Sequence, residues 1–175
     1  MLQVVQGDCL DVLGAYPGPL FDAVVTDPPA GIGMNSTEWD QDRGGRRSWV
    51  AWLAARLDIA RQRCRPGARM LCWSFPRRAH WTGLAIEDAG WEIEDVVTHL
   101  NGQARPRPGA LAPGWEGWWL ARDPRGKSRP LNLDDLPVVV EAGTRLRRRP
   151  RNVLIDGDGH ARPRHQAPAN AANAW

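Results

Sequence analysis

A short apolar segment, residues 21–26, stops abruptly at an Asp-Pro-Pro tripeptide. A continuous apolar segment of this length is typical of a strand buried in a parallel sheet. Asp27, Pro28 and Pro29 follow it directly. Proline has no N–H for sheet pairing and holds the residue before it extended. We therefore expect a buried strand that ends in a rigid turn with Asp27 at its tip.

Strand-like and helix-like segments alternate on both sides of this turn. Strands are expected at 2–6, 21–26, 68–74, 91–100 and 116–122, and helices at 9–13, 48–64 and 80–89. Asp8 is expected to cap the first helix and Gly90 to follow the end of the third. The second helix has helical spacing that predicts one apolar face, formed by Trp49, Trp52, Leu53, Leu57 and Ala60. Such an order predicts an α/β fold with a mostly parallel open sheet and helices on both faces. Ligands of these sheets bind beyond the carboxyl ends of the strands. Asp27 and Asp8 each follow a predicted strand, so both are expected at that edge.

The length and composition exclude several classes of protein. A chain of 175 residues, 42% apolar and 25% charged, is typical of one soluble domain. We find no apolar segment near the roughly 18 residues of a membrane span, and no secretory leader pattern. Three scattered cysteines indicate neither a disulfide framework nor a metal site, and Cys9 and Cys72 are expected in the core. A reducing, cytoplasmic location is expected.

Charge is distributed unevenly along the chain. Up to Gln103 there are 10 basic and 13 acidic side chains, and from Ala104 onward 13 basic and 7 acidic. The second part includes a dense arginine cluster at residues 145–151. Such a cluster is typical of a polyanion-binding surface, although a solvated basic loop has the same composition.

The Asp-Pro-Pro turn offers two hydrogen-bond acceptors to one ligand group. Asp27 and Pro28 both precede a proline, so the Asp27 carboxylate and the Pro28 carbonyl are expected to project together. Such a pair suits an –NH2 group, which has two hydrogens to donate. The amino group of a nucleobase is a poor nucleophile because its lone pair is delocalised into the ring. Accepting both hydrogens favours a tetrahedral nitrogen whose lone pair is free to attack.

The Asp-Pro-Pro strand and residues 7–13 resemble the amino-DNA methyltransferases, which make N6-methyladenine or N4-methylcytosine from S-adenosylmethionine. The segment order is similar to that of the permuted subclass and of phage and prophage site-specific methylases, including those of restriction-modification systems. The resemblance extends over roughly residues 2–157. Further matching segments are Trp39-Asp40 and residues 65–68, 86–91, 115–122 and 151–156. The resemblance implies a partial Rossmann-like sheet of the S-adenosylmethionine-dependent methyltransferases.

The resemblance also implies roles for individual residues. Asp27 and the Pro28 carbonyl would bind the target amino group, and Pro29 would keep the turn rigid. Asp8, with Cys9 beside it, would lie near the adenosine part of the cofactor. The partner would be double-stranded DNA, whose target base must leave the duplex. The aspartate of the motif favours adenine N6.

Two departures from the family pattern stand out. After the second proline the family usually has an aromatic residue that stacks on the flipped base, whereas this chain has Ala30. The candidates for the base-stacking position are therefore Ala30 itself and Trp39. The family's Asp-Pro-Phe-x-Gly-x-Gly cofactor loop is missing, and residues 156–159 imitate it only superficially. A complementing chain would then supply that loop.

These observations divide the chain into two parts. Residues 1–123 are expected to form a partial methyltransferase catalytic domain with an inserted loop at 104–113. Residues 124–175 are expected to be basic and largely irregular, and to contact DNA. The candidate DNA contacts are Arg105, Arg107, Arg145, Arg147, Arg148, Arg149 and Arg151.

Three functions stay open at this point. The first is a DNA amino-methyltransferase. The second is a truncated or accessory DNA-binding remnant without catalysis, which the missing loop favours. The third is transfer to amino groups of RNA or protein. No metal and no membrane partner is expected.

Overall fold

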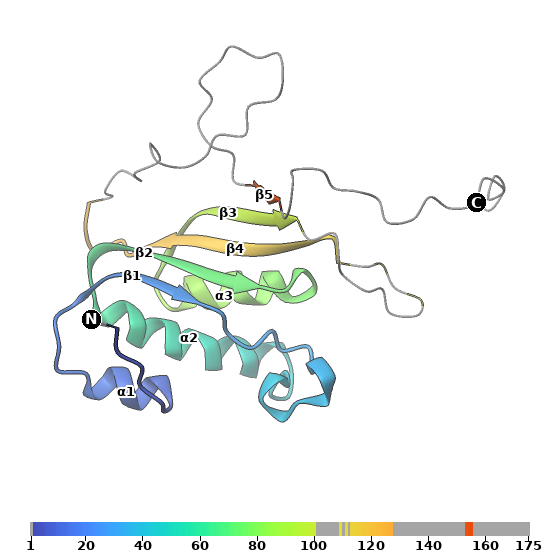
Figure 1. Ribbon diagram of the computed structural model, residues 1–175, viewed down its shortest axis with the longest axis horizontal. Coiled ribbons are helices and arrows are strands. Elements are labelled where there is room, and N and C mark those ends of the chain that lie inside the picture. Colours follow the sequence, from blue (N-terminus) through green and yellow to red (C-terminus); the bar gives the residue numbers. More distant parts are fainter. Residues whose placement is uncertain (1, 101–108, 110, 112, 128–152, 156–175) are drawn as a thin grey trace, which may run out of the picture.

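A computed structural model describes residues 2–100, 109, 111, 113–127 and 153–155, in which a single sheet forms the centre (Figure 1). Within these residues the sheet order is β1-β2-β4-β3-β5. β1 is parallel to β2 and β3 is parallel to β5, whereas β4 is antiparallel to β2 and β3. This confirms the α/β fold and a mostly parallel sheet. The strands are β1 (Phe21–Thr26), β2 (Cys64–Ser74), β3 (Glu92–Leu100), β4 (Trp115–Arg122) and β5 (Val153–Ile155).

The described helices cover one face of this sheet (Figure 1). The α-helices are α1 (Cys9–Ala15), α2 (Arg46–Gln62) and α3 (Ala79–Asp88), and the short 3-10 helices are η1 (Met34–Ser36), η2 (Glu38–Asp40) and η3 (Pro76–Arg78). α2 contacts both α1 and α3, which places the three on the same side. The sequence predicted helices on both faces of the sheet, and the described helices cover one of these faces.

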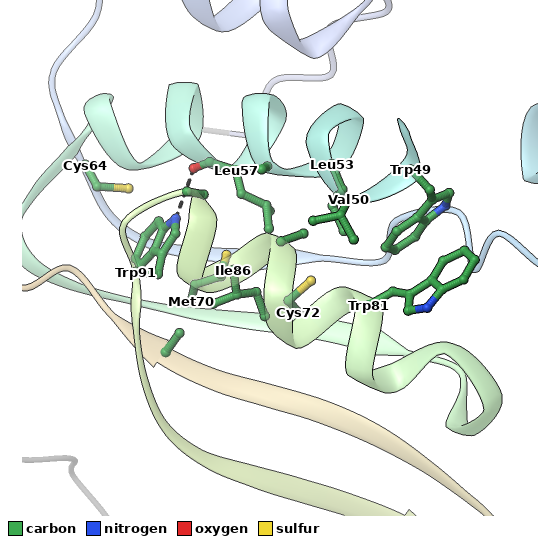
Figure 2. Packing of buried hydrophobic residues seen from close by; sticks show 14 of the residues in the cluster. Trp49, Val50, Leu53, Leu57, Cys64, Met70, Cys72, Trp81, Ile86 and Trp91 are labelled. Atoms are coloured by element: carbon green, nitrogen blue, oxygen red, sulfur yellow. Dashed lines mark hydrogen bonds between the residues drawn. The ribbon is translucent and has the colours of Figure 1, made fainter. Parts of the chain in front are cut away.

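The core lies between α2, α3 and the sheet (Figure 2). Leu53 and Leu57 of α2 face Met70 of β2, and Ile86 of α3 completes the layer. The Trp91 indole N–H donates to the Leu57 carbonyl oxygen at 3.0 Å, so a buried polar group is satisfied within the core. The helical spacing of α2 correctly predicted its buried face.

Local signals at the ends of two helices are confirmed. The Asp8 carboxylate accepts the Leu10 N–H at 2.9 Å and caps α1. Gly90 follows α3 with φ of +79°, a left-handed conformation that favours glycine. The cap places Asp8 at the start of α1, beside the cavity described below.

Three expectations about burial or pairing are wrong. Residues 2–6 form no strand, and Leu2 is 91% exposed, because no described strand lies beside them to pair with. Among the described strands β1 lies at the edge of the sheet rather than inside it, and its Val25 is 71% exposed. Cys9 is exposed rather than in the core, whereas Cys72 is buried as expected.

None of the described helices combines the length and apolarity needed to cross a bilayer.

Candidate active site

The Asp-Pro-Pro turn stands at the carboxyl end of two neighbouring parallel strands. β1 ends at Thr26, which pairs with Cys72 near the end of β2, and Asp27 follows at once. A cavity of about 560 Å³ opens beside this turn, between β1, α1 and α2. Its walls include Asp8, Cys9, Asp27, Pro28 and Pro29. The structure thus brings together all five residues predicted to act in catalysis or cofactor binding.

The Asp27 carboxylate is free to accept hydrogen bonds from a ligand. No donor among the described residues bonds to it, and its side chain lies at an exposed position. Partial desolvation, followed by the nearby Glu116 carboxylate, raises the pKa of Asp27. Glu116 is itself held by the Trp73 indole N–H at 3.1 Å. The site therefore holds Asp27 as a more basic acceptor than an ordinary aspartate.

Asp8 is held in the ionised form on another wall of the cavity. Its Oδ1 accepts the Leu10 N–H, and its Oδ2 lies 3.0 Å from Nη2 of Arg56. The backbone hydrogen bond from Leu10, and then the charge of Arg56, lower the pKa of Asp8. Arg56 also donates to the Trp52 carbonyl oxygen at 3.1 Å. The two carboxylates of the cavity thus have pKa shifts in opposite directions.

A buried aspartate holds the loop that follows the turn. Asp40 is 1% exposed, and its two carboxylate oxygens accept the N–H groups of Gly31 at 2.9 Å and Met34 at 2.8 Å. Gly31 has φ of +69°, and a Cβ there would lie 2.5 Å from the Trp49 indole nitrogen. Sequence analysis singled out Asp40 only as part of a matching pair, and missed this role. Its burial and its backbone partners depend on tertiary structure.

The two candidates for base stacking lie in different surroundings. Ala30 is 8% exposed, whereas Trp39 is 61% exposed and belongs to η2. Neither lines the cavity. Trp52, Arg43 and Arg56 do line it and were missed, because only the folded chain brings them beside Asp27.

The remaining predicted site residues lie outside the described residues. These are the imitation glycine loop at 156–159 and the arginines at 105, 107, 145, 147, 148, 149 and 151. Most of the expected second part, residues 124–175, also lies outside the described residues, although β5 joins the sheet beside β3. In the described part of the chain, no three His, Cys, Asp or Glu side chains form a potential metal site.

Comparison with known proteins shows likeness at the level of the fold. No protein-family model and no curated protein sequence matches. M1.HpyAVI in complex with S-adenosylmethionine is 18% identical over 75% of this chain and 60% of its own, with a TM-score of 0.50. TTHA0409 from Thermus thermophilus, a proposed DNA modification methylase, is 20% identical over 72% of this chain and 56% of its own, with a TM-score of 0.50.

The cytosine-N4-specific PvuII DNA methyltransferase is also similar in structure. It is 14% identical over 85% of this chain and 55% of its own, with a TM-score of 0.59. This chain therefore has the fold that these proteins share, and it spans 55 to 60% of the length of the three structures.

Proposed function

We propose that this chain is a DNA methyltransferase that transfers a methyl group from S-adenosylmethionine to the exocyclic amino group of a flipped base. The observation that most supports this is the placement of Asp27, Pro28 and Pro29 at an open cavity shared with Asp8. The fold shared with DNA methyltransferases agrees with it. The same fold serves many substrates in principle, so the site supports the function more strongly than the fold does.

Asp27 and Pro28 would position the target nitrogen. The Asp27 carboxylate accepts one hydrogen of the amino group, and the Pro28 carbonyl accepts the other. Together they favour a tetrahedral nitrogen with its lone pair aimed at the methyl donor. Because its pKa is raised, Asp27 also attracts the amino proton more strongly than an ordinary aspartate. Pro29 has a fixed φ, which keeps both acceptors in place.

The cavity fits the chemistry of the proposed cofactor. Its volume of about 560 Å³ lies within the range of small-molecule sites. The ionised Asp8 is an acceptor for hydroxyl or amino groups of the adenosine part, and Cys9 lies beside it. When bound, S-adenosylmethionine supplies an electrophilic methyl group on a sulfonium centre. The solved M1.HpyAVI neighbour contains S-adenosylmethionine.

Adenine N6 is the proposed target, following the aspartate of the motif. The exposed ring of Trp39 is the candidate surface for stacking of the flipped base. As in other DNA-modifying enzymes, the base would leave the duplex to reach Asp27. The proposed place of action is the cytoplasm of a bacterial cell, including one infected by a phage.

A second candidate is a DNA-binding chain that does not methylate alone. The edge position of β1 favours it, since Val25 and the apolar cavity wall beside it would pack well against a further strand. A complementing chain with a glycine-rich cofactor loop would supply this strand.

Transfer of a labelled methyl group decides between the candidates. The purified chain is incubated with tritiated S-adenosylmethionine and unmethylated duplex DNA, RNA or protein. We expect label in DNA only, loss of it in Asp27→Asn, and retention in Asp22→Asn, an exposed aspartate at the other end of β1. Label in RNA or protein alone would contradict the DNA substrate. DNA binding without transfer would support the second candidate and overturn the first.

A further inference from the structure

Several arginines lie in the segments at the carboxyl edge of β1 and β2, where Asp27 is located. α2 begins after the β1 turn and ends beside the start of β2, so its first turn lies at the carboxyl edge of β1. η3 follows the carboxyl end of β2 directly. We call the arginines of these segments the arginine edge: Arg43 in the loop before α2, Arg46 and Arg47 in its first turn, and Arg77 and Arg78 in η3.

Two members of the arginine edge are held over tryptophan rings. Cζ of Arg43 lies 3.9 Å from the centre of the Trp52 ring, and Cζ of Arg78 lies 3.5 Å from that of Trp81. Trp49 connects the two rings, with centroid distances of 6.5 Å to Trp52 and 5.9 Å to Trp81 (Figure 2 shows the Trp49–Trp81 contact). Cation–π contacts of this kind position a guanidinium group without neutralising its charge.

The charge of the arginine edge is largely uncompensated. In the part of the chain that the structure describes, Arg78 pairs with Asp42 at 3.6 Å, whereas Arg46, Arg47 and Arg77 have no ion pair. Arg43 has no ion pair there either, although its charge helps to lower the pKa of Asp8. The first turns of α2 and α3 contain no acidic residue. The positive ends of the two helix dipoles therefore add to the arginine charges instead of offsetting them.

We propose that the arginine edge binds the phosphate backbone of duplex DNA around the target base. Guanidinium groups bind phosphate oxygens in a bidentate manner, and arginines over aromatic rings are already oriented for it. A row of arginines, of which only Arg78 has an ion pair among the described residues, lies beside an acceptor for a nucleobase amino group. This arrangement fits a polyanion with bases, rather than a small ligand. This inference rests on the DNA substrate of the proposed function and assigns its phosphate contacts to described residues.

DNA binding in the absence of a methyl donor tests this assignment. Fluorescence anisotropy gives the Kd for one labelled duplex at several salt concentrations. Arg46→Gln/Arg47→Gln and Arg43→Gln are compared with Arg65→Gln, a matched control at the amino end of β2 that pairs with Asp22 at 3.3 Å. We expect the slope of log K against log salt to decrease by about 0.9 for each phosphate that the variant no longer neutralises, and no decrease in the control.

Several results would overturn the inference. These are no duplex binding by the wild-type chain at low salt, unchanged slopes in the variants, or an equal decrease in Arg65→Gln. Tighter binding of an RNA duplex of the same sequence would contradict DNA as the occupant. Arg46 and Arg47 contact no described carboxylate, so removing them should leave the circular dichroism spectrum unchanged. Because no methyl donor is present, failure of catalysis cannot be mistaken for failure of this inference.

Discussion

The buried carboxylate of Asp40 accepts the backbone N–H of Gly31 at 2.9 Å and thereby fixes the chain just beyond the Asp-Pro-Pro turn. A second oxygen of Asp40 accepts the Met34 N–H, and the Gly33 N–H donates to the Asp40 backbone carbonyl at 2.8 Å. η2 is thus bound to the loop after Pro29 by several hydrogen bonds. The loop that directly follows the Asp-Pro-Pro turn is therefore held by a residue of the second short 3-10 helix after it.

Asp40→Asn should destabilise the protein and reduce methyl transfer. An asparagine has one carbonyl acceptor where Asp40 has two carboxylate oxygens, so one buried N–H loses its partner, which costs about 1–3 kcal/mol. Urea unfolding followed by circular dichroism measures the free energy. Glu38→Gln, at an exposed position of the same 3-10 helix, is the matched control. Equal stability of the two variants would show that Asp40 does not hold the loop.

Asp27→Asn should raise the melting temperature at neutral pH although it removes activity. The pKa of Asp27 is raised, so the ionised carboxylate opposes folding at pH 7. When the Asp27 carboxyl is protonated, this cost to the free energy of unfolding is absent. The cost returns as the pH rises through the pKa of Asp27 and the carboxyl ionises. The gain in the variant should therefore shrink as pH falls toward about 4. Thermal unfolding between neutral and acidic pH measures it.

Asp22→Asn is the control for that comparison. Asp22 lies on the same strand but pairs with Arg65 at 3.3 Å, so its replacement should give no gain at pH 7. A gain for Asp27→Asn that grows on acidification would contradict the raised pKa.

One cysteine should react rapidly with a thiol reagent in the native protein. Burial raises the pKa of the Cys64 thiol to about 11 and that of Cys72 to about 12, whereas Cys9 is exposed. Titration with a disulfide reagent at about pH 8 should detect Cys9 alone, and all three thiols in urea. Cys9 lines the cavity, so saturating S-adenosylmethionine should slow its reaction. Rapid reaction of Cys72 in the native state would contradict the described core.

Val25 and Met70 should respond very differently to substitution. Val25 is 71% exposed on the edge strand, so Val25→Lys should change the free energy of unfolding by less than about 0.5 kcal/mol. Met70 is fully buried, so Met70→Ala should cost about 2–5 kcal/mol. Val25→Lys should also reduce concentration-dependent association in light scattering, because lysine protects an exposed edge. A large loss of stability in Val25→Lys would mean that this edge is covered in solution.

Regular local patterns explain what could be predicted from the sequence. The helical spacing within α2 and the capping aspartate before α1 depend on neighbouring residues, and both were identified. The Asp-Pro-Pro turn was placed correctly at the end of β1 for the same reason. Residues 2–6 have a strand-like composition, but a strand also needs a partner, and no described strand supplies one.

Tertiary arrangement explains what sequence analysis missed. Counting charges assigned DNA contact to the basic second part of the chain, because the first part is net acidic. Folding nevertheless gathers Arg43, Arg46 and Arg78 at the edge beside Asp27. The burial of Asp40 likewise depends on the packing of the loop against α2. Neither arrangement is visible as a spacing or a composition.

Analysis of methylated nucleosides tests the central proposal most directly. The chain is expressed in a bacterial host that lacks its own DNA amino-methylation, and the genomic DNA is digested and examined by mass spectrometry. We expect N6-methyladenine with the wild-type chain and with Asp22→Asn, and none with Asp27→Asn. Absence of any methylated amino base with a folded, expressed wild-type chain, or equal methylation by Asp27→Asn, would contradict the account.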